Sequence, residues 1–281
     1  MPIAYPEILK LENKGQKFHY SEKEVMLYAL GIGMGADPMD RKELEYVYGP
    51  VLKVAPTFAS VMAWGANPGA TNVNYLMVVD GERAIEFHQP LPTSADLLAD
   101  SRITGVFDKG PGKGAVVQSE TVIKTARGDK LATIQQSIFA RGDGGFGGPS
   151  SGQPEPHPTP TRAPDQSVDI PTRPDQALIY RLSGDFNPLH ADLDIAEKAG
   201  FPRPILHGMC TYGLTGRAVL QTYAGYDSTR FKSHAARFSS PVFPGETVTV
   251  DLWKDGNIIS FEARVKARNA TVIKNGKTEL S

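Results

Sequence analysis

The chain of 281 residues carries the same landmarks twice, at a nearly constant spacing, and this repeat limits its fold more than any other feature. The matching landmarks lie 151 or 152 residues apart: Tyr28 and Tyr180, the segments that begin at Pro56 and at His207, and the dipeptides Gln89-Pro90 and Ser240-Pro241. Self-similarity at a fixed period indicates a repeated structural unit. The sequence therefore predicts a duplicated fold.

A segment poor in large apolar side chains separates the two copies. Residues 142–148 read GDGGFGG and are followed by PSSGQPEPHPTPTRAPDQ. So much proline, serine and glycine is typical of a linker. No helix-forming sequence follows the glycines, which disfavours a phosphate-binding loop. We expect domains at 1–147 and 166–281 joined by a linker at 148–165.

Each copy places helices before a run of strands. In the first copy, the capping box Ser21/Glu24 predicts a helix that stops at Gly31, followed by helices at 40–48 and 56–64. Alternating runs predict strands at 72–79, 84–89, 96–107, 114–125 and 130–140. In the second copy we expect helices at 172–182, after His190 and after Gly208, then strands at 234–240, 246–253, 257–268 and 269–277. This order predicts α+β domains, each with an antiparallel sheet wrapped around a central helix.

Composition excludes several classes of function. A net charge of −1 and a pI of about 6.6 give no field that would attract nucleic acid or an acidic membrane surface. The single cysteine, Cys210, excludes internal disulfides and is expected to pack in an apolar helix. No apolar run is long enough to cross a membrane, no secretory signal is visible, and Glu279-Leu280-Ser281 does not match a peroxisomal address. We expect a cytoplasmic protein.

One irregular turn concentrates the groups that could do chemistry. Asp185, Asn187 and His190 lie within Gly-Asp-Phe-Asn-Pro-Leu-His, where side chains can converge without a helical or strand period. Each alone is an ordinary turn former, but together with His207-Gly208 they favour an active site. Gly208 should open a helix that begins near Met209, so its N–H would be a natural oxyanion donor.

The first copy lacks these groups. The positions equivalent to Asp185, Asn187 and His190 are Gly33, Gly35 and Pro38. We therefore expect chemistry in the second copy only, with the first copy free to shape a larger binding groove.

The residues around the turn resemble a known family. Tyr180 to His190, Arg203 to Met209 and Ala236 to Gly245 are similar to the hydratase 2 motif of MaoC-like (R)-specific enoyl-CoA hydratases. The first half resembles the amino-terminal half of the hydratase 2 unit of peroxisomal multifunctional enzymes. The resemblance implies a double hotdog fold with one active and one substrate-accommodating copy, a homodimer, no metal and no cofactor apart from the CoA carried by the substrate.

The resemblance also implies a reaction and its residues. The family adds water reversibly, in the syn sense, to a trans-2-enoyl-CoA and gives the (3R)-hydroxyacyl-CoA of β-oxidation, with fatty or steroid side-chain acyl groups. Asp185 and His190 would activate the water, Asn187 would orient the water or His190, and the Gly208 N–H would bind the thioester oxygen. Further contacts with the acyl-CoA would come from these residues: Gly81, Lys109, Phe238, His207, Arg203 and Arg237.

Two departures from the family pattern keep other functions open. Related sequences carry glutamate at the place of Gly49 and histidine at the place of Asp80. Either the activity is altered, or Glu45 replaces the missing glutamate from one turn earlier. The alternatives are a hotdog acyl-CoA thioesterase, a non-catalytic CoA-thioester-binding subunit of a heteromeric hydratase, and a dehydratase for carrier-bound acyl chains.

Overall fold

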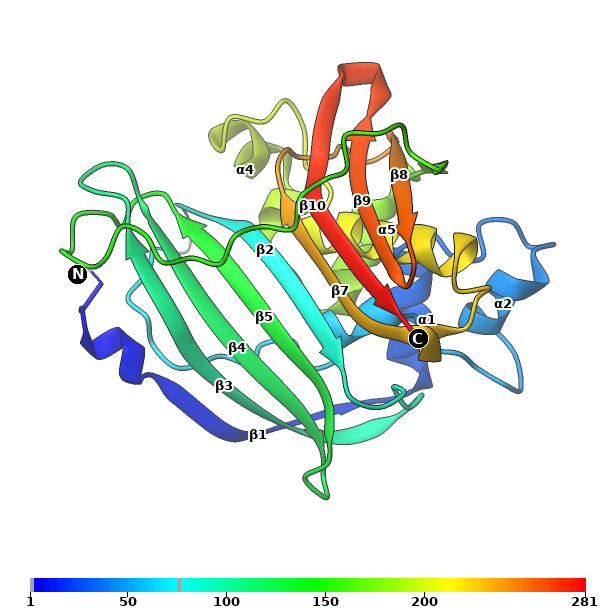
Figure 1. Cartoon of the computed structure of the whole chain (residues 1–281), viewed down its shortest axis with the longest axis horizontal. Helices are drawn as coiled ribbons and strands as arrows, with labels where there is room; N and C mark the ends of the chain where they lie inside the picture. The colour runs from blue at the N-terminus through cyan, green and yellow to red at the C-terminus, as the bar shows by residue number, and fades with distance from the viewer. Residues whose placement is uncertain (1–2, 75–76) are drawn as a thin grey trace.

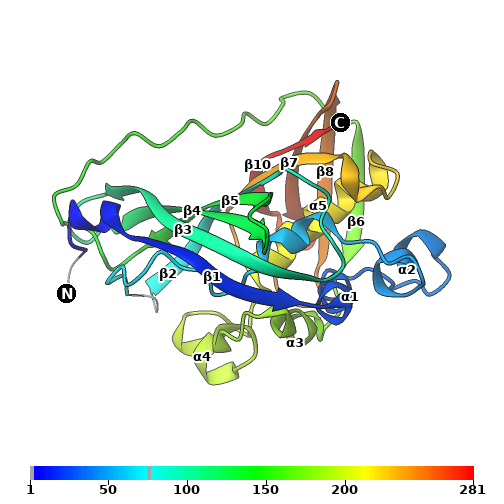
Figure 2. The ribbon, with the colours of Figure 1, turned by 90° about the horizontal axis from the view of Figure 1, so that it is seen from below.

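The computed structural model describes residues 3–74 and 77–281, and in this part of the chain each copy contributes five strands to one sheet. The strands of the first copy are β1 (Glu12–Tyr20), β2 (Val78–Phe87), β3 (Ala95–Asp108), β4 (Ala115–Thr125) and β5 (Lys130–Ala140). Those of the second copy are β6 (Gln166–Pro171), β7 (Phe231–Phe238), β8 (Thr247–Asp255), β9 (Ile258–Val265) and β10 (Ala270–Leu280). Figure 1 shows β1 to β5 and β7 to β10 as one curved, antiparallel sheet, and Figure 2 labels the edge strand β6.

The strand order repeats between the copies. The strand order in the sheet is β1-β3-β4-β5-β2-β7-β10-β9-β8-β6. If the strands are numbered within their own copy, both halves have the order first, third, fourth, fifth, second from the outer edge to the centre of the sheet. The halves join where β2 pairs with β7, from Glu82 opposite Arg237 to Glu86 opposite Ser233. The predicted duplication and the α+β double hotdog class are therefore confirmed.

Helices cover one face of the sheet. They are α1 (Glu22–Gly31), α2 (Arg41–Val47), α3 (Gln176–Tyr180), α4 (Leu193–Lys198) and α5 (Gly208–Thr222), with 3-10 turns η1 (Glu7–Lys10), η2 (Pro56–Ser60), η4 (Arg181–Ser183), η5 (Pro188–His190), η6 (Ser228–Arg230) and η7 (Lys266–Arg268). The predicted capping box of α1 is present, because Ser21 and Glu24 exchange hydrogen bonds. None of these helices is long and apolar enough to cross a membrane, within the residues that the structure describes.

The two copies differ in their central helix. In the second copy, α5 runs for 15 residues and is buried along most of its length. Its counterpart in the first copy is η2, which has 5 residues. The prediction of a helix over 56–64 is therefore wrong beyond Ser60. A short helix is marginal without packing partners, and this segment packs tightly on α5, where a Cβ on Gly216 would lie 2.6 Å from Thr57 Cγ2.

The strands differ from the prediction at three places. β1 and β6 were not predicted at all. The prediction of a strand over 72–79 is wrong for residues 72–74 and 77, and residues 75–76 lie outside the described residues. The end of that run and the run at 84–89 belong to one strand, β2, which begins at Val78 and continues through Asp80 with an irregularity in its register before Glu82. The other predicted strands are present within a few residues.

The linker runs over the face of the sheet that the helices leave free. Figure 2 shows α3 and α4 on one side of the sheet and the linker on the other. The linker is extended and bonded to the strands, since His157 Nε2 lies 2.8 Å from Ser260 Oγ of β9 and Asn275 Nδ2 of β10 donates to the His157 carbonyl.

Candidate active site

A cavity of about 720 Å³ lies between the inner face of the first copy's strands, η2 and the irregular turn before α5. Its volume is in the range of sites for small molecules and cofactors. The turn and α5 contribute Asp185, Asn187, His190, Gly208 and Thr211 to its walls. The strands contribute mainly aliphatic side chains: Ile103, Val117, Ile123, Ile134 and Ile138. The cavity therefore has a polar end at the turn and a largely apolar body under the first copy's sheet.

The turn fixes the two polar side chains that sequence reasoning singled out first. Asp185 Oδ1 accepts a hydrogen bond of 3.1 Å from the Asn187 N–H, and Asn187 Oδ1 accepts one of 3.0 Å from the Leu189 N–H. These Asx-type bonds leave the second oxygen of Asp185 free to face the cavity. Asn187 thus shapes the turn and starts η5, and it also lines the cavity.

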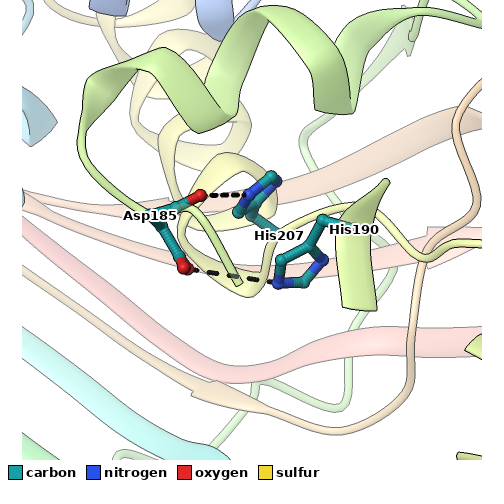
Figure 3. Close-up of side chains that lie close together, drawn as sticks. All are labelled: Asp185, His190 and His207. Atoms are coloured by element: carbon teal, nitrogen blue, oxygen red, sulfur yellow. Dashed lines mark hydrogen bonds and ion pairs between the residues drawn. The ribbon is translucent and has the colours of Figure 1, made fainter. Parts of the chain in front are cut away.

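His190 faces Asp185 across a gap that suits one water molecule. Its Nδ1 lies 2.8 Å from the Ile205 carbonyl oxygen, which can only accept, so Nδ1 carries the proton and Nε2 is the free acceptor. That Nε2 lies 4.0 Å from Asp185 Oδ2 (Figure 3). The distance is too long for a direct hydrogen bond. A water between them would donate one hydrogen to each and keep its lone pairs for a substrate.

His207 supports the turn from behind. The side chain is fully buried, it is absent from the cavity wall, and its ring stacks on that of His190 with 3.7 Å between the ring centres. Its Nε2–H donates to the Asp185 carbonyl oxygen at 3.1 Å (Figure 3). The geometry therefore makes His207 a positioning residue rather than a direct contact of a bound molecule.

Burial keeps both imidazoles neutral. Desolvation lowers the pKa of His190, opposed by the Ile205 carbonyl and by the charges of Asp185 and Asp80. Desolvation, with the neighbouring His190, lowers the pKa of His207 to about 3. A neutral His190 can accept a proton from water at neutral pH.

Gly208 opens α5, as predicted. His207 is the N-cap, so the Gly208 N–H is among the first amides of the helix, which have no partner within it. The space beside its α-carbon is narrow, because a Cβ there would lie 3.2 Å from Asp80 Oδ2 and 3.3 Å from the Phe238 ring. A ligand oxygen can therefore approach this amide closely only while the residue is glycine.

Asp80 is a cavity residue that sequence reasoning noted only as a departure from the family pattern. It reaches the site from β2 of the first copy and lies against Gly208 and near Asp185 and His190. Burial raises the pKa of the Asp80 carboxyl, the charge of Arg83 lowers it, and Asp185 raises it further. The first copy thus contributes a titratable side chain to the wall of the cavity, in addition to shaping it.

Asp185, His190 and His207 also form a group whose ligand atoms lie within 4.8 Å of one another, as a metal site requires. The arrangement fits a metal ion poorly. Each imidazole uses one nitrogen for a backbone carbonyl, and the two rings are stacked. Nitrogen lone pairs lie in the ring plane, so stacked rings do not direct them at one ion.

Of the other predicted contacts, some line the cavity and some do not. Phe238 lines it, whereas Gly81 packs against Ser137 behind Asp80. Lys109 Nζ donates to the Ser150 carbonyl and to Gln153 Oε1 of the linker. Arg203 lies over the Phe243 ring and Arg237 pairs with Glu82. Contacts of these residues with a CoA carrier stay predictions.

The suggested replacement of the missing glutamate fails on geometry. Glu45 forms an ion pair of 2.5 Å with Lys53, its side chain is 45 % exposed, and it does not line the cavity. Gly49 stands in an exposed turn with a φ of 123° and nothing within 4 Å of an added Cβ.

Comparison with known proteins gives concordant matches. Residues 18–142 match the family model described as MFE-2 hydratase 2 N-terminal domain, and residues 156–276 match the MaoC like domain. The chain is 40 % identical to an enoyl-CoA hydratase of Mycobacterium tuberculosis, ChsH3, over 98 % of both chains. It is 37 % identical to the peroxisomal enoyl-CoA hydratase 2 of Arabidopsis thaliana, over 92 % of this chain and 89 % of the other. The crystal structure of a MaoC-like dehydratase from Phytophthora capsici superposes with a TM-score of 0.88 at 30 % identity, covering 99 % of this chain and 98 % of that one.

Proposed function

Since the chain belongs to the MaoC-like hydratases of the hydratase 2 type, we propose that Asp185 and His190 add water to a trans-2-enoyl-CoA held in the cavity. The protein is a hydro-lyase of β-oxidation, an (R)-specific enoyl-CoA hydratase. The observation that carries the assignment of residues is the 4.0 Å gap between Asp185 Oδ2 and His190 Nε2, open to the cavity.

The proposed chemistry needs only water and the side chains of the site. The water donates to both acceptors while its oxygen forms the bond to C3. As that bond forms, the C2–C3 double bond shifts its electrons toward the thioester and negative charge grows on the thioester oxygen. The proton that the water loses is held by the Asp185/His190 pair and returned to C2 on the same face. This gives syn addition and leaves the pair as it began.

The Gly208 N–H stabilises the charge that develops on the thioester oxygen. It stands at the start of α5, where the helix dipole adds to the amide's own field. A donor in such a place is worth ~10²–10³ in turnover when a side chain supplies it. Because a backbone donor cannot be deleted, the glycine must be tested through its close contacts.

The acyl chain occupies the body of the cavity, under strands β2 to β5. We also propose the domain limits 1–147, 148–165 and 166–281, a cytoplasmic location and a homodimer. The two family matches, which stop at residue 142 and begin at residue 156, support the domain limits. Light scattering on the purified protein tests the dimer.

The decisive experiment follows the ultraviolet absorbance of the conjugated thioester with trans-2-decenoyl-CoA as substrate. We expect the absorbance to fall without release of free thiol and the product to be the (3R) alcohol. His190→Ala and Asp185→Asn should each lose at least ~10² in kcat, because each removes one of the two acceptors of the water. Circular dichroism confirms that the variants fold. Free CoA would identify a thioesterase instead, and no reaction with any enoyl-CoA would favour a binding subunit.

A further inference from the structure

One row of polar side chains crosses the floor of the cavity. Arg83 of β2 stands opposite Gln136 of β5, and Gln136 stands opposite Ser119 of β4. Paired residues of neighbouring strands share a face of the sheet, and all three line the cavity. We call Arg83, Gln136 and Ser119 the polar row.

The rows on either side of the polar row are mostly aliphatic. One contains Asp80, Ile138 and Val117, and the other contains Ile85, Ile134 and Thr121. Thr121 is the polar member of the second of these rows, and its hydroxyl is bonded to Ser101 Oγ at 2.9 Å. The polar row therefore stands out because it places three polar side chains between two mostly aliphatic rows.

The side chains of the polar row have no hydrogen-bond partner among residues 3–74 and 77–281. Arg83 is only 7 % exposed, and its Nε is buried without an acceptor. Neither Gln136 nor Ser119 makes a side-chain hydrogen bond or ion pair in the same part of the chain. Leaving the buried Arg83 Nε unpaired costs free energy, and proteins satisfy such a group with ordered water or with a ligand. Gln136 and Ser119 are half-buried, and their side chains are open to a molecule in the cavity.

The charge of Arg83 already has a counterpart. Asp80 stands three residues earlier on β2, on the same inner face, and the two groups interact electrostatically. A second anion in the cavity would compete with Asp80 for this cation. A neutral oxygen, which accepts from Arg83 and Gln136 and exchanges a hydrogen bond with Ser119, suits the row better.

We propose that the polar row binds an oxygen substituent on the acyl chain, so that the preferred substrates are trans-2-enoyl-CoA thioesters with a hydroxyl or keto group far from the thioester. This proposal rests on the proposed function. The reacting end lies at β2, beside Gly208 and Asp80. Ser119 lies two strands further, roughly 10 Å away. The oxygen would therefore sit in the distal half of a medium-length chain.

The test compares plain trans-2-decenoyl-CoA with three derivatives of it, which carry one hydroxyl group at carbon 7, 8 or 9 of the acyl chain. We expect the wild-type protein to prefer at least one hydroxylated substrate by ~10-fold or more in kcat/KM, as one satisfied buried hydrogen bond provides. Gln136→Leu and Ser119→Ala should each abolish most of this preference, by lowering kcat/KM for the hydroxylated substrate much more than for the plain chain. Gln135→Leu is the matched control, since Gln135 is the next residue of β5 and is exposed on the outer face.

Two results would overturn the proposal. One is a wild-type protein that hydrates plain and hydroxylated chains equally well. The other is a pair of variants that lower kcat/KM for both kinds of substrate by the same factor, which would reveal a merely structural role. Arg83→Met is the stronger perturbation, and the two milder variants decide the question if it does not fold. A protein that hydrates none of the thioesters contradicts the proposed function itself, which is a different outcome.

Discussion

At the scale of single residues, the sequence predicts chemistry where the reacting groups are neighbours in the chain. Asp185, Asn187 and His190 fall within six residues of one turn, and Gly208 begins the next long helix, so spacing alone brought them together. Asp80 and the polar row could not be found this way. Asp80 meets Gly208 only because β2 pairs with β7, and Arg83 meets Gln136 only through the register of β2 and β5.

Replacing Gly208 by alanine tests its close approach to the thioester. The new Cβ would lie 3.2 Å from Asp80 Oδ2 and 3.3 Å from the Phe238 ring, so these neighbours must move. We expect kcat to fall by ~10², because a small displacement of the reacting geometry has this effect, while thermal stability stays nearly constant. A variant with wild-type kcat would show that the thioester oxygen does not bind at this amide.

Replacing Asp80 by asparagine tests the electrostatic effect of the Asp80 charge on the pKa of His190. The charge of Asp80 raises the pKa of His190, so its removal should lower that pKa further. The proposed mechanism needs neutral His190, and the acid limb of kcat/KM against pH should therefore move to lower pH in Asp80→Asn. The pH profile of kcat/KM measures this directly. An acid limb that stays in place or moves to higher pH would contradict the interaction.

At the scale of elements, local sequence patterns predicted helices with a side-chain N-cap and strands that pair with another strand on each side. The capping box of α1 and the alternation in β4 and β5 are examples. β1 and β6 were missed because each is an edge strand with one partner and most of its residues exposed, so neither shows a clear alternation. The length of η2 depends on how it packs against α5, which no local pattern encodes.

Gly213 of α5 tests the tight contact between the central helix and α1. A Cβ at this position would overlap Ile32 Cγ2 and lie 3.0 Å from the Tyr28 hydroxyl. Alanine in an exposed helix would gain ~1 kcal/mol over glycine, but here overpacking should cost ~1–3 kcal/mol. Urea unfolding of Gly213→Ala measures the change. Ile32→Ala removes the clashing methyl group, so the double variant should recover part of the loss. Strictly additive effects of the two substitutions would refute the contact.

At the scale of the whole molecule, the spacing of the repeat predicted a duplicated fold, and the shared strand order confirms it. The spacing could not predict that the halves form one sheet with a common core. The single sheet depends on the pairing of β2 with β7. The common core depends on contacts between the copies, such as that of the Tyr28 and Tyr180 rings, whose centres lie 5.9 Å apart. The fold also buries histidines from distant segments.

Those buried histidines make stability depend on pH. Burial lowers the pKa of His207 and of His234 to about 3, whereas in the unfolded chain both titrate near the usual value of 6.5. The unfolded state therefore binds more protons below pH 6.5, and the stability present above that pH is lost progressively as pH falls toward 3. Each histidine contributes a slope of up to ~1.4 kcal/mol per pH unit. Urea unfolding at pH 6.5 and pH 5 measures it, and equal stability at both values would contradict the prediction.

The shortness of η2 has a thermodynamic consequence. α5 fills the second copy with 15 residues, whereas η2 offers the first copy 5 residues, and the cavity lies beneath the first copy's sheet. In the proposed function, the acyl group of the substrate takes the place of core side chains that the chain does not provide. Folding and substrate binding are therefore linked equilibria: a ligand at 100 times its Kd adds ~2.7 kcal/mol to the stability of the folded state. An enzyme of this design is least stable when its substrate is exhausted.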